Sequence, residues 1–471
     1  MRYNDPRIHP YLPSIQPSWV RTFNKTIYDY RDNVPHGSFK SLDEFNWYDG
    51  FSPRFRHSSA LYSPGHATLE PDKARKQDRM LFERDRDKTF LLVDSGGYQV
   101  GTHVWALDEL GEIVPKVIKW QEAISDLAVI LEVPAWMKIN GKYIEFKKAL
   151  NGTIRLLEAY AAHATGAVKF IVPLHGLTFE QGKRWFDATR WFVDKGYAVG
   201  WCMSSIFSAN FYEALRILAY MIEQEHYPRY IHFLGRGQQQ AAILADIMRR
   251  TVPRCYPAHI GAREHGNKLN VTVDASSEFQ SAGRYLQIAR RAVPADSKDY
   301  SVSPFTIKSE TFDSEDRNRY PQNRPYPDVD GPILGHDHNG VAFGDLLSPA
   351  NSKTQSLYNV DDVSTAILIA HNLWVKRDAI ERMKQLESAL RRLDYGMRKG
   401  ETAEMASIMS RLLHMKTNKG QISDLGADLV ATTVGMWRIF KAGVSADDRY
   451  AMIDEIKPNA TKLFGDPLKV D

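Results

Sequence analysis

Apolar runs of strand length alternate with helix-length amphipathic stretches from residue 90 to about residue 280. The expected strands are Phe90–Val93, Leu127–Leu131, Val168–Val172, Tyr197–Val199, Tyr230–Leu234 and Asn270–Val273. Segments such as Ile154–His163, Phe179–Val193, Phe211–Glu225 and Gln239–Arg250 have the apolar spacing of helices. Strands that alternate with helices imply a parallel sheet. The number of units predicts an α/β fold of the TIM type, a closed (β/α)8 barrel.

The regions on either side of this pattern differ from it in composition. Residues 1–57 are rich in proline, aromatics and arginine and form an N-terminal segment leading into the barrel, whose core we expect over residues 58–293. Residues 294–360 have little periodicity and predict an irregular insertion. Residues 361–471 predict a helical C-terminal region, including an amphipathic helix over Asp378–Arg392.

Composition narrows the class of protein. With 11% aromatic and 25% charged residues, the 471-residue chain is typical of a packed globule. Its only cysteines, Cys202 and Cys255, exclude a disulfide framework and a zinc cluster built on cysteines. The N-terminus lacks an apolar leader and no apolar stretch is long enough to span a bilayer, so we expect no membrane partner and a cytoplasmic location. The net charge of +4 permits a nucleic-acid partner without arguing strongly for one.

Polar residues and glycines follow the expected strands. In a (β/α)8 barrel the functional residues lie at the carboxyl ends of the strands. The residues at these ends are Asp94-Ser95-Gly96-Gly97, Glu132, His175, Gly200-Trp201, Leu234-Gly235 and Asp274. A single acid after a strand is often only a turn or helix cap. Three acids at three strand ends of one barrel predict a shared site.

The most informative stretch is residues 90–99, Phe-Leu-Leu-Val-Asp-Ser-Gly-Gly-Tyr-Gln. Gly96 and Gly97 let the backbone turn and let a flat ligand lie against the main chain, and Tyr98 could stack on that ligand. The alternative is a strand followed by a Gly-Gly turn with a capping aspartate.

These motifs resemble those of the tRNA-guanine transglycosylase family, over roughly residues 58–375. Asp94 to Val100 resembles the family signature. The later similarities, in family order, are Phe170–Gly176, Gly196–Trp201, Phe233–Gly237, Val273–Ala275 and Ile369–Leu373.

The resemblance implies a base exchange through a covalent Asp–sugar intermediate. It makes Asp274 the nucleophile and Asp94 the acid/base. The residues around the base would be Ser95, Gly96, Gly97, Tyr98, Glu132, Leu234 and Gly235, with Met203 as the alternative to Leu234. Glu132 would accept the two N–H donors of the guanine edge, with a rim salt bridge as the alternative. The backbone around Gly200 and Trp201, together with His175, would face guanine O6, and for His175 a structural role is the alternative.

The chain also departs from the family pattern. The zinc-binding cysteine triplet is replaced by a segment with His336 and His338, which together with His371 could hold Zn²⁺, and no organic cofactor is implied. About 39 residues separate Gly235 from Asp274, and the helical tail is additional. Such divergence is similar to the branch that replaces guanine in DNA with a 7-deazaguanine, such as 7-cyano-7-deazaguanine, in the cytoplasm of a bacterium or a phage-infected cell.

The partners expected on this resemblance are DNA and a free 7-deazaguanine base. The alternatives are a tRNA-guanine transglycosylase, a hydrolytic base-excision glycosylase and a barrel that binds nucleic acid without turnover. Arg249, Arg250 and Arg254 are candidates for phosphate contacts, with a solvated helix face as the alternative. Whether the chain forms a homodimer stays open.

Overall fold

A computed structural model gives the fold. It describes residues 5–24, 42–49, 52–64, 69–237, 239–257, 269–283, 286–289, 308–311, 348–349, 358–359, 366, 369–378, 380–381 and 424–464.

Eight parallel strands form one sheet in the order β1-β10-β9-β8-β7-β4-β3-β2. Their bounds are β1 (Tyr11–Pro13), β2 (Ser59–Tyr62), β3 (Phe90–Val93), β4 (Leu127–Val129), β7 (Lys169–Leu174), β8 (Ala198–Met203), β9 (Tyr230–Phe233) and β10 (Asn270–Ala275). The outermost strands meet as well, because Ser14 bridges to Leu61 and the Ile15 N–H donates to the Leu61 carbonyl at 2.8 Å. The sheet therefore curls into a (β/α)8 barrel, as the sequence predicted.

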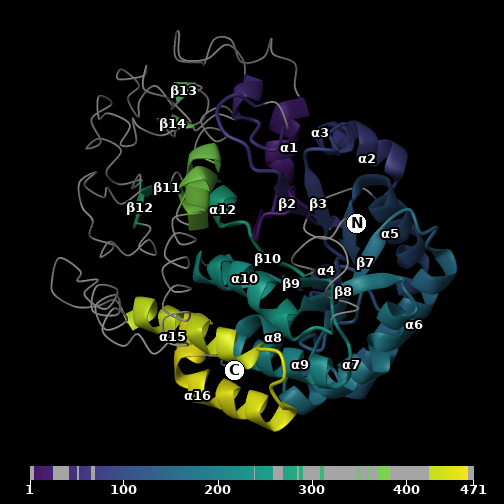
Figure 1. Cartoon of the computed structure of the whole chain (residues 1–471). Helices are drawn as coiled ribbons and strands as arrows, with labels where there is room; N and C mark the ends of the chain where they lie inside the picture. Colours follow the sequence, from purple (N-terminus) through teal and green to yellow (C-terminus); the bar gives the residue numbers. More distant parts are fainter. Residues whose placement is uncertain are drawn as a thin grey trace, which may run out of the picture.

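Helices lie between successive strands (Figure 1). They are α1 (Pro17–Asn24), α2 (Pro71–Gln77), α3 (Arg79–Phe82), α4 (Gly97–Gly101), α5 (Leu110–Ile124), α6 (Phe146–His163), α7 (Phe179–Asp194), α8 (Ile206–Ala209), α9 (Phe211–Glu223), α10 (Gln239–Thr251) and α12 (Ser277–Gly283), with 3-10 turns η2 (Leu42–Phe45) and η4 (Val252–Cys255). A hairpin of β5 (Lys138–Ile139) and β6 (Lys142–Tyr143) stands between β4 and α6. It turns at Asn140 and Gly141, both at positive φ, as a tight hairpin requires.

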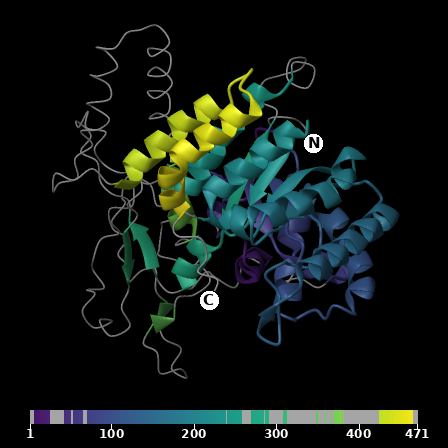
Figure 2. The ribbon, with the colours of Figure 1, turned by 90° about the horizontal axis from the view of Figure 1, so that it is seen from below.

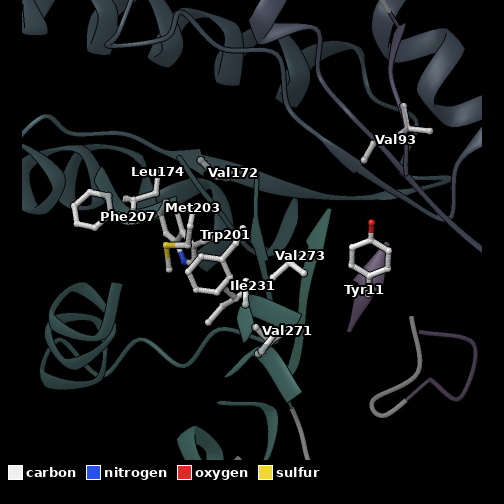
Figure 3. Packing of buried hydrophobic residues seen from close by; sticks show 14 of the residues in the cluster. Tyr11, Val93, Val172, Leu174, Trp201, Met203, Phe207, Ile231, Val271 and Val273 are labelled. Carbon is white, nitrogen blue, oxygen red and sulfur yellow. The ribbon is translucent and has the colours of Figure 1, made fainter. Parts of the chain in front are cut away.

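Strand alternation divides the buried side chains into two layers. Leu12, Leu61, Leu92, Val129, Ile171 and Cys202 belong to one cluster inside the barrel. The residues between them in sequence belong to a second, larger cluster that packs the strands against the helices. Figure 3 shows part of this second layer, with Trp201, Ile231, Val271 and Val273. On β10, Val271 and Val273 belong to the outer layer, so the side chain of Asp274 projects toward the barrel axis.

Two C-terminal helices pack on the outside of the barrel. Helices α15 (Asp424–Ile439) and α16 (Ala446–Phe464) lie side by side in both views (Figures 1 and 2). Tyr212 of α9 donates to Asp454 of α16 at 2.5 Å, and Arg254 donates to the Trp437 carbonyl of α15 at 3.1 Å. The chain is also helical over residues 369–378. This agrees with the predicted helical C-terminal region, although most of the expected helix Asp378–Arg392 lies outside the described residues.

Three expectations about element bounds need correction. Residues 1–57 do more than lead into the barrel, because strand β1 pairs with β10 and is one of its eight strands. Strand β8 runs to Met203 instead of ending at Val199, and β4 ends at Val129 instead of Leu131. Most of the irregular insertion expected over 294–360 lies outside the described residues, which contain three short strands there: β12 (Lys308–Thr311), β13 (Ser348–Pro349) and β14 (Tyr358–Asn359). Strand β12 pairs with β11 (Leu286–Ala289), and β13 pairs with β14.

Candidate active site

Three expected site residues form one hydrogen-bonded group at the ends of β3 and β4. The Ser95 hydroxyl donates to Glu132 Oε2 at 2.7 Å and accepts the Gly97 N–H at 2.9 Å. Both side chains are buried, with Ser95 1% and Glu132 4% exposed. A carboxylate survives such burial only when polar partners replace water. The hydroxyl of Ser95 therefore ties the turn after β3 to the acid after β4.

The two glycines of this turn serve different purposes. Gly96 begins α4 at φ +88°, a conformation that favours glycine. A Cβ at Gly97 would lie 1.9 Å from Glu132 Oε1, so only a residue without a side chain lets the backbone approach the carboxylate this closely. The Gly-Gly pair is thus needed for the turn and for the position of Glu132.

Asp94 ends β3 inside the same group and has a strongly shifted pKa. Its carboxylate accepts the Ser95 N–H at 2.8 Å and the Ser63 hydroxyl at 3.4 Å. Burial raises the pKa of Asp94 to about 7, helped by the negative charges of Glu132 and Asp274, while the two hydrogen bonds oppose the rise. Asp94 therefore titrates near neutral pH, as a group that both gives and takes a proton must.

His175 connects the ends of β7 and β8 and is fully buried. Its Nδ1 lies 2.9 Å from the Ser205 hydroxyl, and its Nε2 lies 3.7 Å from Glu132 Oε1. The Nε2 atom has no hydrogen-bond partner among the described residues. His175 thus belongs to the Glu132 group, as part of the same strand-end rim.

Asp274 lies across the barrel mouth, on β10, and is 7% exposed. Its Oδ1 accepts the Gly235 N–H at 2.6 Å and lies 3.2 Å from Nε2 of His232. Gly235 has a φ of +67°, which aims its N–H from the end of β9 toward the neighbouring strand. His232 was absent from the expected set. Its signal in the sequence is the strand alternation, which places His232 and Leu234 on one face of β9.

The three acids lie at the same end of the barrel, because Asp94, Glu132 and Asp274 each stand at the carboxyl end of a parallel strand. Cys202 lies inside the barrel on β8, and burial raises its pKa far above the ordinary value. The negative charges of Asp94, Glu132 and Asp274 contribute to the same rise.

The other expected base-binding residues divide into two groups. Leu234 is half-buried and packs against the interior cluster, and Tyr98 is 65% exposed on α4, with its ring centroid 6.2 Å from that of Trp136. Gly200 and Trp201 do not belong to the strand end. Gly200 pairs with Tyr230 in mid-strand, and the Trp201 indole donates to His226 at 2.9 Å among the helices. The reason is that β8 continues two residues beyond the Gly-Trp pair, to Met203.

A buried polar cluster beside Asp274 was not expected. Glu278 of α12 is fully buried, accepts from the Tyr11 hydroxyl at 2.5 Å and forms an ion pair with Lys376. Lys376 also donates to Ser277 Oγ at 2.5 Å and to the Gly237 carbonyl at 3.3 Å. The helical segment 369–378 is therefore fixed to β1 and to the loops after β9 and β10.

Of the three expected zinc ligands, the structure describes only His371. His336 and His338 lie outside the described residues. His371 is buried with its ring centroid 5.8 Å from that of Trp374, and the described ranges contain no group of three metal-binding side chains.

Two of the arginines expected to contact phosphates have partners within the protein. Arg250 pairs with Asp246 at 2.5 Å, and Arg254 stacks 4.4 Å from the centre of the Trp437 ring. These two arginines serve helix packing instead of a free basic surface.

Comparisons with known proteins add no relative to this picture. A scan against protein-family models finds no match, and a search of curated proteins finds no significant relative. In the described part of the chain, no helix is long and apolar enough to cross a membrane.

Proposed function

We propose that the protein is a pentosyltransferase that replaces guanine in DNA with a free 7-deazaguanine base. The observation that carries the proposal is the placement of Asp94, whose pKa is about 7, and Asp274 at the carboxyl ends of two parallel strands of one barrel. Two carboxyl groups with separate roles are what a glycosidic exchange with retention needs. Because guanine and its replacement are both purine-like bases, one pocket would serve departure and entry.

The exchange divides into two balanced steps. In the first, the Asp274 carboxylate bonds to the anomeric carbon as the C1′–N9 bond breaks, and protonated Asp94 gives its proton to the departing guanine. In the second, N9 of the incoming base attacks C1′, the Asp274–sugar bond breaks, and Asp94 takes the N9 proton. Asp94 ends the cycle in the protonation state in which it began.

The base would lie between the Gly96-Gly97 turn and Leu234. Glu132 offers carboxylate oxygens to the N1–H and N2 amino groups of guanine, and the Ser95 hydroxyl orients that carboxylate by donating to Oε2. The exposed Tyr98 ring, next to Trp136, is available to stack on the target base or on its neighbour. Glycosidic bonds are hidden inside a duplex, so a DNA target would be flipped out or single-stranded.

A basic hairpin stands beside this mouth and supports a polyanionic partner. The hairpin, Lys138–Tyr143, and the start of α6 together hold four lysines and one glutamate over residues 138–148, a net charge of +3. Lys138 and Lys142 are exposed, and the Lys138 carbonyl lies 2.6 Å from Nε2 of His103, which follows α4. The hairpin is therefore fixed to the segment that carries Tyr98. We propose that it contacts phosphates flanking the target nucleotide, in the cytoplasm of a bacterium or a phage-infected cell.

Label transfer tests the function directly. Purified protein is incubated with labelled guanine and either duplex DNA or tRNA at matched salt, and label is counted in each polymer. We expect label in DNA, and Asp274→Asn should give neither exchange nor a protein–DNA adduct that survives denaturant. Label in tRNA alone would overturn the DNA assignment. Free guanine released from DNA without label entering it would identify a hydrolytic glycosylase.

A further inference from the structure

A buried histidine lies beneath the carboxylate of Asp274. His232 projects from β9 into the barrel and is fully buried, with its Nε2 3.2 Å from Asp274 Oδ1. Its Nδ1 lies 2.8 Å from the Thr272 hydroxyl, which in turn lies 3.0 Å from the Tyr230 hydroxyl. The four side chains form one line on the adjacent strands β9 and β10, ending at the proposed nucleophile.

The direction of these hydrogen bonds follows from the donors available. Burial raises the pKa of Tyr230 above its ordinary value, so its phenol keeps its proton. Thr272 Oγ1 is the hydrogen-bond partner of that phenol within the described ranges, so Tyr230 donates to Thr272. The proton of Thr272 is then available to His232 Nδ1. An imidazole that accepts at Nδ1 carries its proton at Nε2, which lies 3.2 Å from Asp274 Oδ1.

A backbone N–H also contacts the oxygen of Asp274 that lies near His232. The Gly235 N–H donates to Oδ1, the atom that His232 faces. Nε2 of His232 lies 3.2 Å from the same oxygen but has no hydrogen-bond partner among the described residues. Other titratable groups around the imidazole are Tyr230 on its own strand and Cys202, its register partner on β8.

We propose that His232 is a positioning residue: its Nε2, buried and unpartnered 3.2 Å from Asp274 Oδ1, donates to that oxygen when Asp274 reacts and so leaves Oδ2 as the atom that bonds to the sugar. The proposal rests on the proposed role of Asp274 as nucleophile. In the covalent intermediate, Oδ2 bonds to C1′ and Oδ1 becomes the ester carbonyl. When the C1′–Oδ2 bond breaks, the electron pair returns to the carboxylate, and the N–H groups of His232 and Gly235 stabilise its charge.

The tautomer of His232 can be measured without any catalysis. The full-length protein is labelled with ¹⁵N-histidine, and the His232 signals are identified by their loss in His232→Gln. We expect a neutral ring with its proton on Nε2 at pH 7. A proton on Nδ1, or on both nitrogens, would overturn the directed chain.

Kinetics then separate positioning from mere packing. His232→Phe keeps a ring but removes the donor, so kcat for guanine exchange should fall roughly 10²- to 10³-fold with little change in KM. His232→Gln, whose amide can place an N–H near the same point, should recover much of the rate.

A second variant, Thr272→Val, tests whether the hydroxyl beside His232 matters. Thr272→Val keeps the side-chain shape but removes the hydroxyl that fixes the tautomer, and it should lose less activity than His232→Phe. Wild-type kcat in His232→Phe would refute the positioning role. If wild-type protein exchanges no base while the Nε2 proton is present, the proposed function fails and the contact to Asp274 stands.

Discussion

The carboxylate of Glu132 helps to raise the pKa of Asp94, and the two residues follow the ends of the adjacent strands β3 and β4. Burial is the largest cause of the rise and the charge of Glu132 is the second. One acid thus tunes its neighbour while remaining available to a ligand itself. Because the two charges interact, pH profiles of this site report the pair as a whole.

Removing the charge of Glu132 should shift the pH dependence of the exchange. In Glu132→Gln the pKa of Asp94 falls, so the rate should decline on the alkaline side at a lower pH than in wild type. The KM for guanine should rise, because one of its acceptors becomes an amide. Rate profiles between pH 5 and 9 measure both effects. An unchanged profile with an unchanged KM would place Glu132 outside the site.

Asp94→Asn should separate catalysis from stability. Loss of a general acid/base group costs roughly 10²- to 10⁴-fold in turnover. The folded-state pKa of about 7 lies above the ordinary 3.8, so wild-type stability falls as pH rises between these values. The variant escapes this loss and should be more stable than wild type at pH 8, by up to about 4 kcal/mol, with little difference at pH 4. Denaturant unfolding at both pH values measures this, and a variant that is less stable at pH 8 would indicate a structural cap.

Gly97→Ala should damage the position of Glu132. The new methyl group would overlap Glu132 Oε1, so the carboxylate must move at a cost of about 1–3 kcal/mol, and guanine binding should weaken. Gly111→Ala on α5 is the matched control, because a Cβ there has no atom within 4 Å. The control should be unchanged or more stable by up to about 1 kcal/mol. Calorimetry with guanine compares the two, and equal affinities would argue against the Gly97–Glu132 contact.

The hairpin lysines should set part of the salt dependence of DNA binding. Each lost phosphate contact reduces the slope of log affinity against log salt by about 0.9 on duplex DNA. The double substitution of Lys138 and Lys142 with Gln should therefore reduce it by about 2. Lys195→Gln, at the end of α7 and thus at the opposite barrel face, should leave it unchanged. Equal slopes in all three proteins would remove the hairpin from the interface.

The sequence predicted the fold where strands were long and apolar. Six of the eight barrel strands overlap their expected ranges, because β3 and β7 to β10 are buried on both faces and appear as continuous apolar runs. Strands β1 and β2 were missed. Strand β1 is only three residues long, with Pro10 before it and Pro13 as its last residue. Strand β2, Ser59–Tyr62, mixes polar and apolar residues. Such short strands are defined by their partners across the sheet.

The site residues that directly follow an apolar run could be predicted, and those whose role depends on distant residues could not. Asp94, Glu132 and Asp274 were predicted because each directly follows an apolar run. His232 and Lys376 were missed, since the role of each depends on residues far away in sequence, such as Asp274 and Glu278. Arg254 was misread for the converse reason, because its partner Trp437 lies on a helix that no local pattern connects to it.

The pairing of β1 with β10 also fixes when a growing chain can become complete. Tyr11 and its partner Val273 are 262 positions apart, so β1 leaves the ribosome long before its neighbour is synthesised. Until then, one edge of β1 stays unpaired. The strand that closes the ring is the same strand that carries Asp274, so no shorter nascent chain holds both carboxylates in place. The strand that completes the barrel thus also completes the group of three acids.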